Sequence, residues 1–203
     1  MDLAIAKSLG CIVLRGNCID EIAKSSSSAS PQKPKLPYHV TVFTKAEIQN
    51  FDDERKTRIE HFLNESPSLT LPVDLGVGIQ GSVKFNVIFW PQGDKIRALF
   101  GLPRKNFHVT LSSTDNHDID KGVTAMSRCK TLTVEQVDQI ISTCSTLVSS
   151  PSDTRNYALE VVRFIARSHI LCLSEFSFDK AWRILFKLSY LSLIHIWRCR
   201  RRG

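Results

Sequence analysis

Two short stretches of this chain repeat one pattern, and each is predicted to form a β-strand. Each places an aromatic residue before His-Val-Thr and continues with mostly apolar residues: Tyr38-His39-Val40-Thr41-Val42-Phe43 and Phe107-His108-Val109-Thr110-Leu111-Ser112. This alternation has period two, which is typical of a strand. Because successive strand side chains point to opposite faces, His39 and Thr41 share one face, and so do His108 and Thr110.

The side chains on these two faces suit the chemistry of a phosphate. An imidazole can take up or release a proton near neutral pH, and a hydroxyl can donate a hydrogen bond to a charged oxygen. Two such strands can therefore act on one phosphate from both sides. The alternative is a pair of ordinary strands whose histidines lie in the core or on the surface, and the pattern alone leaves both interpretations open.

Composition indicates a globular chain without a membrane span. With 203 residues, 42% of them hydrophobic, it can form one well-buried domain with a smaller appendage. The run from Ile184 to Trp197 is short and contains Lys187, so we expect no membrane contact. Asp2 and Lys7 interrupt the apolar start, which argues against a signal peptide.

The cysteines carry no metal or redox motif. Six cysteines are scattered without a Cys-x-x-Cys pair, so neither a zinc ribbon nor a thioredoxin motif is supported. We therefore predict no metal and no cofactor, and a cytoplasmic or nuclear protein with reduced thiols.

Much of the positive charge lies in the last six residues. The net charge is +7, and without Arg198, Arg200, Arg201 and Arg202 it falls to +3. The rest of the chain is only mildly basic, so charge alone is weak support for nucleic-acid binding. The final segment, residues 191–203, resembles the translation of a sequencing adaptor; the alternative is a basic C-terminal tail, and we assign it no function.

The N-terminal part is predicted to mix strands and helices. Residues 10–15 indicate a strand, and the Ser-rich residues 25–35 indicate a flexible loop. Thr44 and Glu47 fit a capping box, which predicts one helix through about Leu63. Further strands are expected over 73–79 and 83–90, followed by a turn over 91–94.

A Gly-x-Gly-x-x-Gly sequence runs from Gly76 to Gly81. A dinucleotide-binding motif requires a helix after these glycines, but the next residues predict a strand. A tight turn or a β-bulge is the better interpretation.

After about Val123 the pattern changes to helices without strands. Thr133 and Gln136 resemble a second capping box, which predicts a helix to about Val148. Another is expected over Thr154–Cys172, and a third begins near Phe178. We therefore divide the chain into a domain over 1–125, a helical segment over 126–190 and the doubtful tail over 191–203.

The paired motifs, 69 positions apart, resemble the two-histidine (2H) phosphoesterase superfamily. The stretches Leu36–Thr41 and Phe107–Ser112, with Asp115–Gly122 after them, are similar to its Swiss-army-knife RNA-repair-like branch. The similarity covers about residues 8–125. It implies an α+β fold, bilobal and pseudo-symmetric, with antiparallel sheets and flanking helices, followed here by an α-helical C-terminal segment.

The resemblance also implies a function and a set of site residues. It implies metal-independent opening of 2′,3′-cyclic phosphates of RNA or nucleotides, in RNA repair or processing. His39 and His108 would be the acid and the base, in an order left open, and Thr41 and Thr110 would bind the phosphate. Further candidate substrate contacts are Arg104, Lys105 and His117.

Two other interpretations stay open. The same residues could form a non-catalytic module that binds RNA or a nucleotide, with the C-terminal helices binding a protein partner. The chain could also be a fragment of a larger multidomain protein.

Overall fold

The computed structural model describes most of the chain. The described residues are 3–26, 37–65, 67–113, 115–116, 118–147, 152–168, 181 and 183. The chain divides into two compact units, Met1–Lys130 and Thr131–Gly203. The first unit combines an antiparallel sheet with helices and the second is helical where it is described, so the fold is α+β as the sequence predicts.

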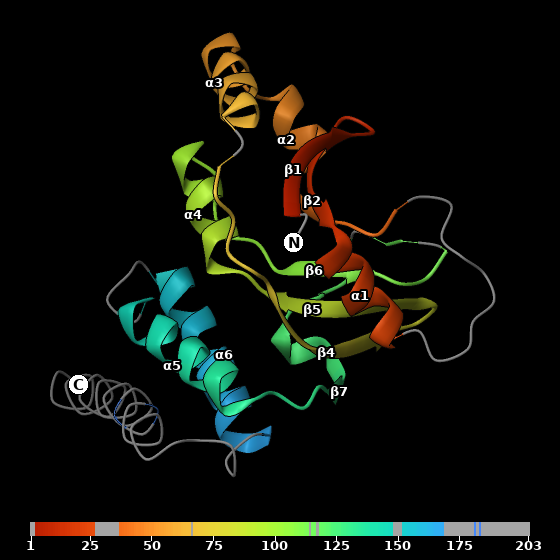
Figure 1. The fold of residues 1–203 in the computed structure, drawn as a ribbon, viewed down its shortest axis with the longest axis vertical. Helices are drawn as coiled ribbons and strands as arrows, with labels where there is room; N and C mark the ends of the chain where they lie inside the picture. Colours follow the sequence, from red (N-terminus) through yellow and green to blue (C-terminus); the bar gives the residue numbers. More distant parts are fainter. Residues whose placement is uncertain are drawn as a thin grey trace, which may run out of the picture. The chain divides into compact units, whose positions relative to one another are not determined.

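One seven-stranded sheet forms the centre of the first unit (Figure 1). Its order is β1-β2-β3-β6-β5-β4-β7, and every pair of neighbours is antiparallel. The strands are β1 (Leu3–Ser8), β2 (Cys11–Gly16), β3 (Val40–Phe43), β4 (Val73–Gln80), β5 (Val83–Phe89), β6 (Phe107–Thr110) and β7 (Met126–Cys129).

The strand order shows the pseudo-symmetry that the family resemblance implies. From the junction of β3 and β6 the order runs outward through β2 and β1 on one side, and through β5 and β4 on the other. The two strands that carry the His-Val-Thr sequences are therefore the innermost strands of two similar halves. Val40 of β3 pairs with Val109 of β6 at this junction.

Helices cover one face of this sheet with a continuous apolar core. The core joins strand residues such as Leu14, Val40 and Val109 to Ile19 of α1 and Ile96 of α4. Burial of such side chains is the main favourable contribution to folding. The helices of this unit are α1 (Asn17–Ser26), α2 (Lys45–Gln49), α3 (Asp53–Asn64) and α4 (Pro91–Leu99), with the 3-10 turn η1 (Val123–Ala125).

The single helix expected between Thr44 and Leu63 is wrong, because the chain forms two helices there. The capping box is present: the Thr44 hydroxyl accepts from the Glu47 amide at 3.3 Å, and the Glu47 carboxylate accepts from the Thr44 amide at 2.8 Å. However, the helix that it opens, α2, ends at Gln49. Asp52 then accepts from the Arg55 amide at 2.8 Å and starts α3, because an N-cap aspartate satisfies an amide of the first turn.

The turn expected over 91–94 is also wrong. These residues form the first turn of α4, and Pro91 occupies a position where a helix needs no amide donor. Gly93 lies against the Trp90 ring, where a Cβ atom would come within 2.2 Å of a ring carbon, so close packing and not a reversal of the chain requires this glycine.

The glycine-rich sequence lies where a strand was expected, in β4 and its turn into β5. The register of β4 shifts between Asp74 and Gly76, and Gly81 lies in the turn with a φ of +58°. The bulge and turn interpretation is therefore confirmed. In contrast, β7 forms after residue 125, where only helices were expected, because it pairs with β4 at the edge of the sheet.

Where it is described, the second unit contains two helices that pack on each other, α5 (Val134–Leu147) and α6 (Ser152–Ser168). The capping box at its start is confirmed, since Thr133 and Gln136 exchange backbone-to-side-chain bonds at 3.0 and 3.3 Å. Both helices bury apolar residues at helical spacing, such as Val137, Ile140 and Ile141. The helix predicted from about Phe178 falls almost wholly outside the described residues, as does the tail.

Candidate active site

The two His-Thr pairs lie on adjoining strands and on one face of the sheet. Val40 and Val109 pair across the junction and are both 0% exposed, whereas His39, Thr41, His108 and Thr110 are all partly exposed. In an antiparallel pair the positions beside a paired residue also oppose each other, so Thr41 opposes His108 and His39 opposes Thr110. The two histidines are thus diagonal neighbours, whose Cβ atoms are typically about 7–8 Å apart.

Both imidazoles are oriented by the same local hydrogen bond. His39 Nδ1 lies 3.1 Å from the carbonyl oxygen of Pro37, and His108 Nδ1 lies 3.1 Å from that of Asn106. A carbonyl oxygen can only accept, so Nδ1 carries the proton in both rings. The other ring nitrogen, Nε2, is then an acceptor in the neutral ring and a donor in the protonated ring, which suits general base and general acid catalysis.

The surroundings of the two histidines differ. In β5, Val87 pairs with His108 and Phe85 pairs with Thr110, and the Phe85 ring lies edge-on to the His108 imidazole at 6.3 Å. Burial lowers the pKa of His108 to about 4, and the Lys121 charge acts in the same direction, against the Asn106 carbonyl and Asp115. His108 is therefore neutral at pH 7.

This burial predicts a loss of stability in mild acid. Between its unfolded pKa of 6.5 and its folded pKa of about 4, His108 binds a proton only in the unfolded chain, so stability falls as the pH is lowered through this window. The full effect is about 3 kcal/mol. Chemical denaturation at pH 7 and pH 4 measures the stability that each protein loses in acid. This loss should be about 3 kcal/mol smaller in His108→Gln than in the unmodified protein. An equal loss in both proteins would contradict a buried neutral imidazole.

Two carboxylates hold the loop after β6, and one of them connects it to the segment that carries His108. Lys121 is 4% exposed, and its ammonium contacts Asp115 at 2.5 Å. Asp120 accepts from the Asn106 side chain at 3.1 Å and from the Gly122 amide at 2.8 Å. Asn106 is the residue whose carbonyl orients His108, so this loop supports the imidazole. No local pattern in the sequence indicates that Lys121 would be buried.

The remaining candidates for substrate contact are Arg104, Lys105 and His117. Arg104 is mostly buried and donates to the Lys105 carbonyl at 3.2 Å and to Asn106 Oδ1 at 3.0 Å, so it braces the segment before β6. Lys105 is half-buried, and its charge affects the pKa of His108. His117 lies outside the described residues.

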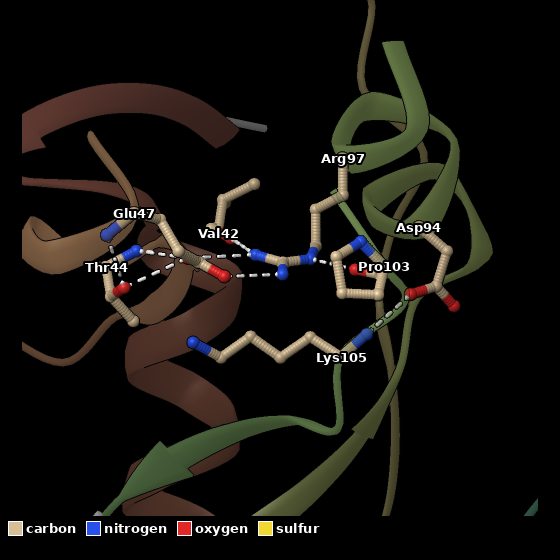
Figure 2. A network of polar contacts seen from close by, with 7 residues as sticks. All are labelled: Val42, Thr44, Glu47, Asp94, Arg97, Pro103 and Lys105. Atoms are coloured by element: carbon tan, nitrogen blue, oxygen red, sulfur yellow. Dashed lines mark hydrogen bonds and ion pairs between the residues drawn. The ribbon is translucent and has the colours of Figure 1, made fainter. Parts of the chain in front are cut away.

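Arg97 is a buried structural residue next to this region. It is 2% exposed and donates to the Val42 carbonyl at 2.6 Å and the Pro103 carbonyl at 2.7 Å. Its guanidinium also forms a 2.7 Å ion pair with Glu47 (Figure 2). Arg97 therefore joins α4 to the end of β3 and to α2, and its donors are not available to a substrate.

The described parts of the chain were also searched for metal sites and for helices that could span a membrane. Among these residues, no three or more His, Cys, Asp or Glu side chains gather as a possible metal site. No described helix has the length and apolar character needed to cross a membrane.

One comparison with known proteins gives a match. A family model described as "Swiss Army Knife, 2H phosphoesterase domain" matches residues 10–117, more than half of the chain. The matched range contains both His-Val-Thr strands and five of the seven strands of the sheet, β2 to β6. Neither the curated proteins nor the solved structures gave a match.

Proposed function

Because this chain belongs to the Swiss Army Knife family of 2H phosphoesterases, we propose that it opens 2′,3′-cyclic phosphates at RNA ends or in nucleotides. The reaction needs no metal ion, and it serves RNA repair or processing. The observation that supports this most directly is the junction of β3 and β6, where two His-Thr pairs occupy one face and both rings have the same Nδ1 hydrogen bond.

The proposed reaction is a hydrolysis with two proton transfers. A water oxygen attacks phosphorus as one histidine accepts its proton through Nε2. The bond from phosphorus to one ribose oxygen breaks, and the other histidine protonates that oxygen. The products are a phosphomonoester and a free ribose hydroxyl. Thr41 and Thr110 donate hydrogen bonds to the nonbridging oxygens, where negative charge grows in the transition state.

The burial of His108 supports a proposed assignment of the two roles. His108 is neutral at pH 7 because of its burial, so it acts as the general base. His39 acts as the general acid. Arg104 supports the segment that carries His108.

A direct assay tests this proposal. Adenosine 2′,3′-cyclic phosphate is incubated with the protein in excess EDTA, and the products are separated by chromatography. We expect a single adenosine monophosphate, since each turnover breaks one phosphorus–oxygen bond. If the protein binds the nucleotide and no cyclic or 2′-5′-linked substrate is turned over, the non-catalytic binding module is correct instead. Turnover that EDTA abolishes would contradict the metal-free mechanism.

A further inference from the structure

An arginine lies beside His39 on the face of the sheet that carries the two His-Thr pairs. Leu14 of β2 pairs with Val40 of β3, so the next positions, Arg15 and His39, also oppose each other. Leu14 and Val40 belong to the apolar core, and the residues next to them therefore point to the opposite face. Residues that oppose each other in this way have Cβ atoms about 4.5–5.5 Å apart, so Arg15 and His39 are direct neighbours.

The other half of the sheet has no charged residue at the matching positions. In β5, the partners of the two site residues of β6 are Val87 and Phe85, whose side chains are 3% and 0% exposed. In β2, by contrast, Arg15 is exposed, and so is its partner in β1, Ala4. The face next to the His-Thr pairs is thus covered over β5 and accessible over the end of β2 that carries Arg15.

A hollow of about 450 Å³ adjoins this arginine. Its lining includes Arg15, Tyr38 and Pro37, the residue whose carbonyl oxygen orients His39. Asp20 also lines it, in the first turn of α1, where a helix N-terminus stabilises a carboxylate. The volume is within the range of sites that bind small molecules, so the hollow can receive a part of the substrate.

The guanidinium of Arg15 is available to a ligand. Within the described residues it makes no hydrogen bond, ion pair or ring contact, and it forms no ion pair with Asp20. Arg97 and Arg104 of the same unit, in contrast, donate to protein acceptors. The N–H donors of a guanidinium form a fork that matches two oxygens of one phosphate. The position and the chemistry of Arg15 therefore favour contact with a phosphate group.

The proposed roles of the histidines place the nucleoside on this side of the site. The attacking water and the leaving ribose oxygen lie on opposite sides of phosphorus. The water is next to the base, His108, so the ribose is next to the acid, His39, whose outer neighbour is Arg15. Phosphorus lies over the line between β3 and β6, and β2 is about 7 Å from that line, one and a half strand spacings. This length is comparable to the separation of successive phosphates in an RNA strand.

We propose that Arg15 binds the phosphodiester that joins the terminal cyclic nucleotide to the preceding nucleotide of an RNA strand, and that the hollow beside Arg15 receives this preceding nucleotide. The inference rests on the proposed function and names its substrate class, the ends of RNA strands. It also gives the strand a direction, from the junction of β3 and β6 outward over β2.

The test changes the charge of one linkage in the substrate. The dinucleotide ApA with a 3′-terminal 2′,3′-cyclic phosphate is prepared with its natural phosphodiester and with an uncharged methylphosphonate in its place. In the unmodified protein, kcat/KM should be at least about 10-fold higher for the phosphodiester, as one charge-assisted contact allows. In Arg15→Met this ratio should fall to near one. Arg15→Lys, which keeps the charge but not the fork, should retain part of it.

A matched arginine provides the control. Arg128 is exposed on β7, at the opposite edge of the same sheet, and Arg128→Met should keep the full ratio. The comparison of the two linkages in the unmodified protein needs no variant, so it applies even if Arg15→Met fails to fold.

The outcomes separate the two proposals. The inference about Arg15 is wrong, and the proposed function stands, if the unmodified protein opens both dinucleotides at equal kcat/KM or opens only adenosine 2′,3′-cyclic phosphate. The same holds if Arg15→Met keeps the full ratio or slows both dinucleotides equally. If neither the dinucleotides nor adenosine 2′,3′-cyclic phosphate is opened, the proposed function fails and the inference fails with it.

Discussion

Replacing either His39 or His108 by alanine should lower kcat/KM for cyclic phosphate opening by about 10²–10⁴-fold, the usual contribution of a positioned general acid or base. In the proposed reaction each histidine has its own proton transfer, so neither can replace the other. The double variant should have a kcat/KM only slightly below that of the less active single variant, because the effects of substituting residues that act together in one step are not additive. Single-turnover kinetics with adenosine 2′,3′-cyclic phosphate would measure the loss.

A third histidine supplies the control for this experiment. His61 lies on α3, is exposed and contacts Glu65 at 3.3 Å, so His61→Ala should keep full activity. Circular dichroism of each variant separates loss of chemistry from loss of folding. Unchanged turnover in both His39→Ala and His108→Ala, in folded proteins, would contradict two-histidine catalysis.

Replacing Glu47 by alanine should destabilise the first unit by about 3–5 kcal/mol, because it leaves the Arg97 charge buried without its carboxylate. The side chain of Arg97 is 2% exposed and that of Glu47 is 25% exposed. The substitution also removes the capping box of α2, to which Glu47 contributes its side chain. Urea unfolding monitored by fluorescence would measure the change in free energy.

The control is an ion pair of the same type on the surface. Lys7 and Glu60 lie 3.0 Å apart with side chains 59% and 64% exposed, so Glu60→Ala should change stability by about 1 kcal/mol or less. In the double variant Glu47→Gln with Arg97→Met, the loss should be smaller than the sum of the single losses. If Glu47→Ala lowers the free energy of unfolding by less than about 1 kcal/mol, the Arg97–Glu47 ion pair does not stabilise the fold as expected.

The pair should also contribute to acid denaturation. Burial alone would raise the pKa of Glu47, but hydrogen bonds from Arg97 and Thr44 and the Arg97 charge outweigh it and hold the pKa at about 2, against an ordinary 4.5. The pair therefore stabilises the fold fully above pH 4.5, and this contribution is lost as the pH falls toward 2. Arg97→Met should lack this part of the acid transition.

The sequence predicted best those elements whose signal is local. β5 is a run rich in β-branched and aromatic residues, and the His-Val-Thr alternation correctly predicted strands where β3 and β6 form. The capping boxes at Thr44 and Thr133 were visible because their partners lie three residues away. The same period-two rule placed His39 with Thr41, and His108 with Thr110, on one face of each strand. That the two pairs share one face of the sheet depends on the pairing of Val40 with Val109, which no local pattern indicates.

Elements decided by tertiary contacts were missed. Pro91 and Gly93 are frequent in turns, yet they start α4, since a proline also fits a first helical turn and Gly93 is needed against Trp90. No local pattern indicates that Arg97 is buried, because its acceptors Val42 and Glu47 lie about 50 residues away. One missed signal was present: Ile19, Ile22 and Ala23 have the helical spacing that buries one face of α1.

The junction of β3 and β6 depends more on side-chain packing than on backbone pairing. Within the described residues a single pair, Val40 with Val109, is in register there, whereas β1 with β2 and β4 with β5 are paired along most of their length. Val40 and Val109 are fully buried in one core cluster, and Arg97 of α4 donates to the Val42 carbonyl at the end of β3. The spacing of the two His-Thr pairs is therefore set by the core beneath them, and substitutions in that core should alter it without touching either histidine.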